Sequence, residues 1–491
     1  MKHNKTFSNV LFIFLQVFKA APFFVILAII DAVRAEWCNY FEHTYGIYYI
    51  LESIEFHRSL GDVMKFLLLL TLIVLLSGVY SCIFEDNFKV RYMPRIKQRV
   101  KEMIYEKAKS IDLEYYDDPE YYSNFVLAIK EINNSVDRLF NLIKIFFGGI
   151  TIIICYGSFF IRKDMVSIVF AIVSFLLSSI FRKKLNKIYY DIRIESNPAE
   201  KKRNYIQRLM YLNRYAKELR LNKQIYRSLY NDFDAENDKM VSICRKYEKK
   251  RYLYEMLGGF ISTDFIINIV YVIFLVYKAA VLKLISYSSV VVMYNSVNNL
   301  QRGMSTSKEF YVNSIELSLY VKKIRGFLNL ENHVRDTGNA LVSKKQDDII
   351  FENVSFKYNA TDKYTLKDLN MQIKSNQKVA IVGANGAGKS TLIKLLLRLY
   401  DVNSGQIKYG NKNIKDYKLS DYRKSVGIVY QDFNLYACSV AENVVMDDVT
   451  YDDEQVWKAI DKSGVYDLIS EYPNKLQTQI TTEFDEKGVE L

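Results

Sequence analysis

The stretch Lys378-Val379-Ala380-Ile381-Val382-Gly383-Ala384-Asn385-Gly386-Ala387-Gly388-Lys389-Ser390-Thr391-Leu392-Ile393 decides how the C-terminal part of the chain folds. A short β-branched run leads into the pattern Gly-x-x-x-x-Gly-Lys-Ser, and an apolar run of helical character follows. This strand–loop–helix order is typical of a phosphate-binding loop. Its glycines let backbone N–H groups converge on an anion, and the helix start adds partial positive charge. The sequence therefore predicts a nucleoside triphosphate site.

The residues of this loop have separate predicted roles. We expect Lys389 to act on the outer phosphates as a catalytic residue and Ser390 to bind Mg²⁺. The predicted nucleotide contacts are Gly383, Asn385, Gly386, Ala387, Gly388, Lys389, Ser390 and Thr391. A chance glycine-rich turn is the alternative, and the strand and helix patterns on both sides of the loop argue against it.

The composition indicates a membrane protein. Half of the 491 residues are hydrophobic, and the net charge is +12. Lys and Arg gather in the connections between apolar blocks, as the positive-inside rule describes. They do not form a basic face with base-stacking aromatics, so we expect no nucleic-acid partner. The five cysteines have no spacing that suits a disulfide framework or a zinc site.

Apolar blocks in the first 300 residues predict six membrane spans, and charge asymmetry predicts that both termini lie in the cytoplasm. The predicted spans are about 20–40, 64–84, 139–161, 165–181, 256–277 and 279–300. Lys2 to Val17 reads as an interfacial helix, since no small-residue cleavage site of a signal peptide follows. Glu36 to Asp62 is poor in Lys and Arg, which predicts an extracytoplasmic position. Lys144 and Asp264 either contact substrate or mark span ends shifted by one turn.

Two long basic connections between the spans read as helices that extend into the cytoplasm. The tip of the first includes Asp118, a good N-cap, and Pro119, which suits a first helical position. We expect a short helix to start there, with a plain surface turn as the alternative. The tip of the second connection is expected within residues 214–223.

The chain changes character after its helical pattern ends near Leu328. Residues 331–348 read as a polar linker, and short β-rich pieces follow at 349–356, 369–373, 379–382, 406–409 and 426–430. The predicted fold is a multi-domain membrane protein. An all-α transmembrane domain (1–330) with long cytoplasmic helical extensions precedes an incomplete α/β P-loop nucleotide-binding domain (349–491).

This order of parts resembles the ABC exporter family, in the form of a half-transporter with its membrane domain fused ahead of its nucleotide-binding domain. Val354-Ser355-Phe356-Lys357-Tyr358 is similar to the family's opening strand, where Tyr358 would stack on adenine; a core tyrosine is the alternative. Ser404-Gly405-Gln406-Ile407 resembles the turn and strand after the P-loop helix. Val429-Tyr430-Gln431-Asp432 resembles the Q-loop, so Gln431 would reach Mg²⁺ and the attacking water as a second catalytic residue.

Two stretches depart from the family pattern. Asn376-Gln377 stands where the family usually has Gly-Glu or Gly-Gln, a mild change because Asn tolerates left-handed φ. The sequence ends at Leu491, where the family continues into Ser-Gly-Gly-Gln. We therefore expect a truncated chain without the signature motif, the strand with the Mg²⁺-binding Asp and catalytic Glu, and the switch His. Such a chain by itself is expected to bind ATP but not to turn it over.

The resemblance implies ATP and Mg²⁺ as cofactors and a multi-pass position in the cytoplasmic membrane. It also implies a homodimer, or a heterodimer with a second half-transporter, that exports an unidentified substrate across the lipid bilayer. The alternative is a membrane-anchored ATP-binding remnant or regulatory protein that does not hydrolyse ATP.

Overall fold

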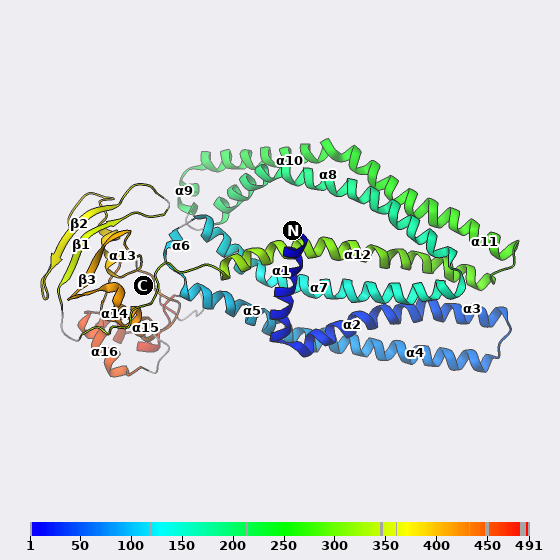
Figure 1. The fold of residues 1–491 in the computed structure, drawn as a ribbon, viewed down its shortest axis with the longest axis horizontal. Coiled ribbons are helices and arrows are strands. Elements are labelled where there is room, and N and C mark those ends of the chain that lie inside the picture. Colours follow the sequence, from blue (N-terminus) through cyan, green and yellow to red (C-terminus); the bar gives the residue numbers. More distant parts are fainter. Residues whose placement is uncertain are drawn as a thin grey trace. The chain divides into compact units, whose positions relative to one another are not determined.

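The computed structural model describes residues 2–117, 119–212, 215–343, 347–359, 361–431, 433–446, 451–481 and 488–489. The chain divides into two units, Met1–Asn332 and His333–Leu491. The first unit is helical and the second holds a small sheet (Figure 1).

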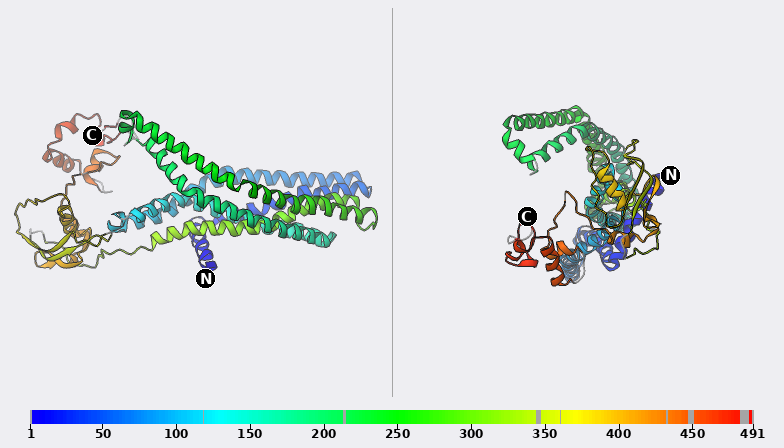
Figure 2. Two further views of the ribbon diagram at one scale, coloured as in Figure 1. Left: turned by 90° about the horizontal axis from the view of Figure 1, so that it is seen from above. Right: turned by 90° about the vertical axis from the view of Figure 1, so that its left-hand side faces the viewer.

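Long helices build the first unit, and several of them run side by side along its length (Figures 1 and 2). They are α1 (Lys2–Ala20), α2 (Pro22–Tyr40), the π-helix η1 (Phe41–Gly46), α3 (Ile47–Glu55), α4 (Leu60–Cys82), the π-helix η2 (Ile83–Lys89), α5 (Val90–Ser110), α6 (Glu114–Asp117), α7 (Pro119–Lys163), α8 (Val166–Tyr211), α9 (Ala216–Leu221), α10 (Lys223–Gly259), the π-helix η4 (Phe260–Tyr271), α11 (Val272–Ala280) and α12 (Tyr287–Leu328).

The N-terminal helix α1 covers the segment that the sequence predicts as an interfacial helix. It is bent by 113° from the helix that follows, which begins at Pro22. Its buried face includes Ile13 and Val17. The Asn9 amide also donates to the Ser318 hydroxyl of α12 at 3.0 Å. The helix is therefore held by apolar packing and by a buried polar contact.

Helical structure extends beyond the end of the first predicted span. Helical structure continues past Tyr40 through η1 and α3 to Glu55, and only residues 56–59 break it before α4. The predicted extracytoplasmic stretch 36–62 is therefore mostly helix. Within this helical stretch Glu36 pairs with Arg302 of α12 at 3.0 Å. The extracytoplasmic position of the stretch stays a prediction.

By length and composition, four helices among the described residues can cross a membrane, and the bent pair that contains α2 is a possible fifth. The boundary of the last predicted span also differs from the expected one. Helix α11 continues to Ala280, and α12 begins only at Tyr287, with the Ser286 hydroxyl accepting from the Ser289 N–H as its cap.

The tips of the two helical connections hold short helices. Helix α9 lies within residues 214–223, where the second tip was expected. At the first tip a helix does begin at Pro119, but it is the long α7; the short helix is α6, which ends at Asp117. Asp118, the predicted N-cap, lies outside the described residues.

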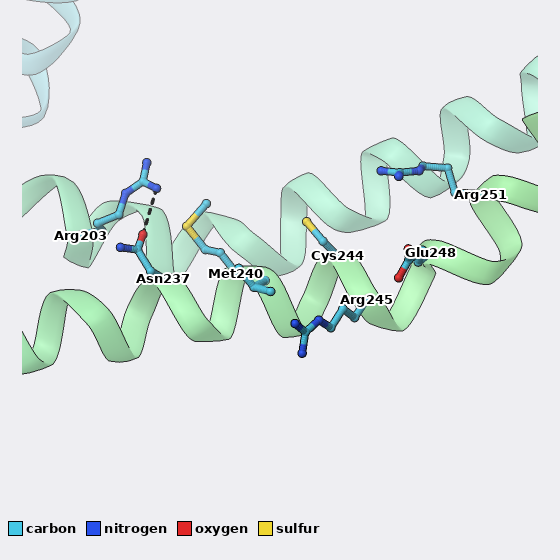
Figure 3. A pocket seen from close by; sticks show the side chains of 8 residues that line it. Arg203, Asn237, Met240, Cys244, Arg245, Glu248 and Arg251 are labelled. Atoms are coloured by element: carbon cyan, nitrogen blue, oxygen red, sulfur yellow. Dashed lines mark hydrogen bonds between the residues drawn. The ribbon is translucent and has the colours of Figure 1, made fainter.

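Helices α8 and α10 form a pair joined by polar contacts, such as Lys246 to Glu195 at 2.9 Å. A groove of about 510 Å³ follows the pair, and Cys244 is one of the side chains that line it (Figure 3). At one end, Arg203 donates to the Asn237 side chain at 3.4 Å.

The second unit is built around an antiparallel sheet with the order β2-β1-β3-β4. Its elements are β1 (Ile349–Phe356), β2 (Leu366–Ile373), α13 (Lys389–Leu396), β3 (Ser404–Tyr409), β4 (Lys412–Asn413), η5 (Ile414–Asp416), α14 (Leu419–Lys424), α15 (Val440–Val445), α16 (Asp453–Lys462), α17 (Tyr466–Ser470) and η6 (Lys475–Gln477).

Two predicted β-rich pieces, 379–382 and 426–430, are not strands in this structure. Both sequences are β-branched and apolar, but a strand needs a neighbour for its ladder hydrogen bonds. Val382 and Val429 are instead 92% and 93% exposed. The prediction of strands at these two places is wrong for the described chain.

The predicted linker 331–348 is attached to the second unit along part of its length. Gly338 approaches the backbone of Tyr417 so closely that an added Cβ would lie 2.3 Å from its carbonyl oxygen. The Ala340 N–H donates to the Asp416 carbonyl at 3.0 Å, and Ala340 forms a parallel bridge with Tyr417. This segment is therefore packed onto the second unit.

Candidate functional site

The predicted phosphate-binding loop has the backbone shape that its glycines allow. Gly386 and Gly388 have φ values of 81° and 90°. A Cβ at Gly388 would also lie 2.8 Å from Leu366 Cδ2, so both backbone and space require glycine there. Helix α13 begins at the next residue, Lys389. The loop therefore leads into a helix N-terminus, as the sequence predicts.

The Lys389 side chain closes the loop. Its ammonium group donates to the carbonyl oxygens of Gly383 and Ala384, both at 2.8 Å. The Ala387 N–H donates to the Ala384 carbonyl at 3.2 Å. The first N–H groups of α13 have no partner within their helix, and they carry the positive end of its dipole. A cation and backbone donors are thus gathered at one exposed loop, which fits a phosphate group.

The other predicted loop contacts divide into exposed and buried groups. Asn385 and Ser390 are exposed, whereas Thr391 is buried. Ser390 lies on the first turn of α13, where a hydroxyl next to bound phosphate can bind Mg²⁺. The predicted roles of these residues toward ATP and Mg²⁺ stay predictions.

Tyr358 lies against the helix that follows the loop. Its hydroxyl is 3.1 Å from Thr391 Oγ1. Its ring packs edge-on against Tyr400, with 5.4 Å between the ring centroids, and the Lys394 ammonium lies 5.6 Å from the Tyr358 centroid. The ring is half-buried, so it is neither a fully enclosed core residue nor a free surface ring.

The contacts of Tyr358 with Thr391 and Tyr400 were not expected from the sequence. Each joins residues more than 30 positions apart, and no motif relates them. They attach the predicted adenine platform to the P-loop helix.

Gln431 follows the unpaired segment 426–430 and lies exposed in a bend. Among the described residues, no hydrogen bond joins it to the loop, and its neighbour Asp432 is outside them. Its predicted contact with Mg²⁺ and the attacking water stays a prediction.

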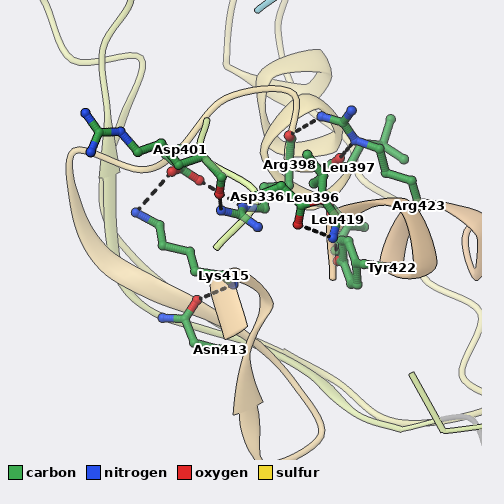
Figure 4. A network of polar contacts seen from close by, with 11 residues as sticks. Asp336, Leu396, Leu397, Arg398, Asp401, Asn413, Lys415, Leu419, Tyr422 and Arg423 are labelled. Atoms are coloured by element: carbon green, nitrogen blue, oxygen red, sulfur yellow. Dashed lines mark hydrogen bonds and ion pairs between the residues drawn. The ribbon is translucent and has the colours of Figure 1, made fainter. Parts of the chain in front are cut away.

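A polar network holds the far end of the P-loop helix (Figure 4). The Tyr422 hydroxyl, from α14, donates to the Leu396 carbonyl at 2.8 Å. Arg423 donates to the carbonyls of Leu397 and Arg398 at 3.3 and 2.7 Å. Leu396 is the last residue of α13, and Leu397 and Arg398 directly follow it, so the three carbonyls lie at the C-terminal end of the helix, where donors within the helix are lacking.

The same network includes the attached part of the linker (Figure 4). The buried Arg398 guanidinium donates to the Arg335 carbonyl at 2.8 Å and to the Asp401 carboxylate at 3.2 Å. The Leu419 N–H donates to Asp336 at 2.8 Å. The helix that carries the candidate site is thus fixed to the segment that precedes the sheet.

Parts of the chain match known proteins. Residues 366–482 match the family model described as ABC transporter. A putative multidrug export ATP-binding/permease protein of Staphylococcus aureus is 40% identical over 147 residues, 30% of this chain and 25% of that protein. The mitochondrial ATP-dependent permease MDL1 of Saccharomyces cerevisiae is 37% identical over 147 residues, 29% of this chain and 21% of that protein. The matched stretch is therefore about a quarter or less of these relatives' length.

The fold comparison extends over much more of the chain. A bacterial Atm1-family ABC exporter, solved with ATP bound, superposes with a TM-score of 0.63 at 18% identity, over 94% of this chain and 79% of that chain. At this identity the likeness concerns the fold. Residues 366–482 therefore match the ABC transporter family, and the chain taken as a whole has the fold of an ABC exporter.

Proposed function

We propose that this chain is the ATP-binding/permease subunit of an ABC exporter, which couples ATP binding and hydrolysis to the export of a substrate across the cytoplasmic membrane. The shape of the loop carries the proposal. Gly386 and Gly388 have positive φ, and the Lys389 ammonium group donates to backbone carbonyls of the same loop. In our proposal the loop residues 383–391 bind the phosphates, Tyr358 stacks on adenine, and Ser390 and Gln431 hold Mg²⁺.

The proposed arrangement in the membrane keeps the predicted order of parts, with the span ends where the helices of the structure place them. Residues 1–330 form a six-span domain, 331–348 connect it to the nucleotide domain, and both termini are cytoplasmic. Described helices of suitable length and apolar composition support the membrane position. We propose that a second half-transporter, identical or different, completes the enzyme.

The experiment measures nucleotide binding, ATPase activity and transport with the full chain reconstituted in liposomes, alone and with its candidate partner. Relatives are named multidrug exporters, so ethidium is a suitable first transport probe. We expect ATP-dependent ethidium movement that Lys389→Ala abolishes. Lys412→Ala, which removes a lysine from the β3–β4 hairpin, is the matched control.

The results separate the proposal from its alternative. Hydrolysis that requires Lys389 and is stimulated by a transported compound supports the exporter. ATP binding without turnover, with and without a partner, contradicts it and favours a membrane-anchored ATP-binding protein that does not hydrolyse. Absence of Lys389-dependent ATP binding contradicts both functions.

A further inference from the structure

A pocket of about 340 Å³ opens at the surface of the helical unit, between α2, α7 and the segment formed by η2 and the start of α5. Its volume is at the lower end of the range for small-molecule sites, roughly 300–1,000 Å³. The proposed nucleotide site uses none of its residues. The pocket is lined by Phe24, Ala28, Asp31, Ala32, Phe84, Glu85, Lys89, Met93, Asp137, Phe140, Asn141 and Lys144.

One part of the pocket wall is aromatic and ordered by stacking. Phe24, 1% exposed, stacks on Phe84 with 5.6 Å between centroids and 10° between the rings. Phe24 also contacts Phe140 at 5.2 Å. Phe84 belongs to the π-helix η2, and such irregular helical turns often occur at functional sites. This wall suits an apolar chain.

Among the charged side chains that line the pocket, one lysine has no carboxylate partner among the described residues. Each of the pocket's three carboxylates already has a cationic partner within 2.8 Å. The pairs are Asp31 with Arg34 at 2.7 Å, Glu85 with Lys89 at 2.5 Å, and Asp137 with Lys97 at 2.8 Å. Lys144 also lines the pocket, at its exposed edge, and within the described part of the chain it has no ion pair or hydrogen bond.

Lys144 lies within a helical segment, Glu131–Lys163, that can cross a membrane by length and composition. A charged group at such a position is costly unless it is hydrated, paired or used for a ligand. The three carboxylates that line the pocket are already paired with other cations. A ligand with one negative charge would therefore balance the charge of Lys144.

We propose that this pocket binds a single-chain anionic amphiphile, with its carboxylate on the Lys144 ammonium and its apolar chain along Phe24, Phe84 and Phe140. The binding does not require nucleotide. It is therefore independent of the proposed transport function, and a negative result would leave that function untouched.

The test uses native mass spectrometry of the full chain in a neutral detergent without nucleotide. The probes are oleate, oleyl alcohol as the uncharged equivalent, and acetate as the charged group without a chain. Lys144→Met removes the charge and Lys144→Arg keeps it. Ala28→Leu fills the pocket and leaves Lys144 in place. Lys65→Met removes an exposed lysine of α4 outside the pocket and is the matched control.

We expect Lys144→Met and Ala28→Leu each to weaken oleate binding at least tenfold, with Lys144→Arg and Lys65→Met close to the unchanged protein. Oleyl alcohol should bind the unchanged protein and Lys144→Met alike, and excess acetate should not displace oleate. Full oleate binding by Lys144→Met would overturn the proposal. An equal loss in Lys65→Met, or unchanged binding in Ala28→Leu, would also overturn it, since binding would then be non-specific or outside the pocket.

Discussion

Arg423 donates from Nη2 to the carbonyl oxygen of Arg398 at 2.7 Å, and so holds the end of the helix that begins at Lys389. Its Nε donates to the Leu397 carbonyl at 3.3 Å. A cation at this end also faces the negative pole of the helix. The far end of the P-loop helix is thus fixed by α14, while its near end forms the candidate site.

Replacing Arg423 should loosen the P-loop helix without removing any nucleotide contact. Arg423→Ala should cost about 1 kcal/mol, the typical net value of such hydrogen bonds. Hydrogen exchange of the α13 amides should become faster. Lys424→Ala, at an exposed neighbouring position, is the control. Equal exchange rates in both variants would show that Arg423 does not hold the helix.

The nucleotide affinity should be more sensitive to substitution of Gly388 than to substitution of Gly427. Gly388→Ala places a Cβ at φ 90° and against Leu366, so we expect at least a tenfold loss of fluorescent ATP analogue binding. Gly427→Ala has open space around its new Cβ and should bind normally. Normal binding by Gly388→Ala would argue against this loop as the nucleotide site.

Tyr358 should contribute to ATP binding through its aromatic ring more than through its hydroxyl group. Stacking of a base on an aromatic side chain contributes roughly 1–3 kcal/mol. Tyr358→Ala should therefore weaken ATP binding by about tenfold or more. Tyr358→Phe loses only the contact with Thr391 and should stay within a few-fold.

The adenine contact can be separated from the phosphate contact with inorganic triphosphate as a competitor. Its affinity should be the same in the unchanged protein and in Tyr358→Ala, because Tyr358 is not expected to contact phosphate. An equal loss for ATP and for triphosphate would show that the substitution damages the loop, and would leave Tyr358 as a packing residue.

The pair of Asp164 and Lys278 should stabilise the helical unit chiefly because each charge needs the other. Their side chains are 6% and 16% exposed, with 2.9 Å between Nζ and Oδ1. Lys278→Met leaves the Asp164 carboxylate buried without its cation, at a cost of about 3 kcal/mol. The double variant with Asp164→Asn should recover much of the loss. Additive effects on thermal unfolding in detergent would contradict this coupling.

The turn at residues 56–59 should be extracytoplasmic and Cys244 cytoplasmic. In a chain whose other cysteines are replaced, Phe56→Cys should react with an impermeant maleimide in intact cells, because Phe56 is exposed in that turn. Cys244, exposed in the α8–α10 groove (Figure 3), should react only after permeabilisation. The reverse pattern would invert the proposed orientation.

Cys38 gives an independent check of where the first span ends. At 1.5 Å per residue, about 25 Å of helix separates it from Glu55, close to the thickness of a bilayer core. We therefore expect Cys38 to be protected in intact cells. Its labelling there would support the shorter first span predicted from the sequence.

Several features could be predicted from the sequence because they depend on neighbouring residues. The glycine pattern before Lys389 determines a loop with left-handed positions, and the structure has them at Gly386 and Gly388. Asn376 likewise has the left-handed φ, 60°, that its side chain tolerates. The change from helical to β-rich character near residue 349 agrees with the start of β1. The overall exporter-type fold was also predicted from the order of these parts.

Tertiary structure alone decided the features that depend on distant partners. The apolar segments 379–382 and 426–430 have strand-like sequences, but ladder hydrogen bonds come from another part of the chain and are absent there among the described residues. The ion pair of Glu36 with Arg302, far along the chain, could not be predicted from the residues around Glu36. Local sequence determines what a segment can form, whereas burial and pairing depend on which distant residues the fold brings next to it.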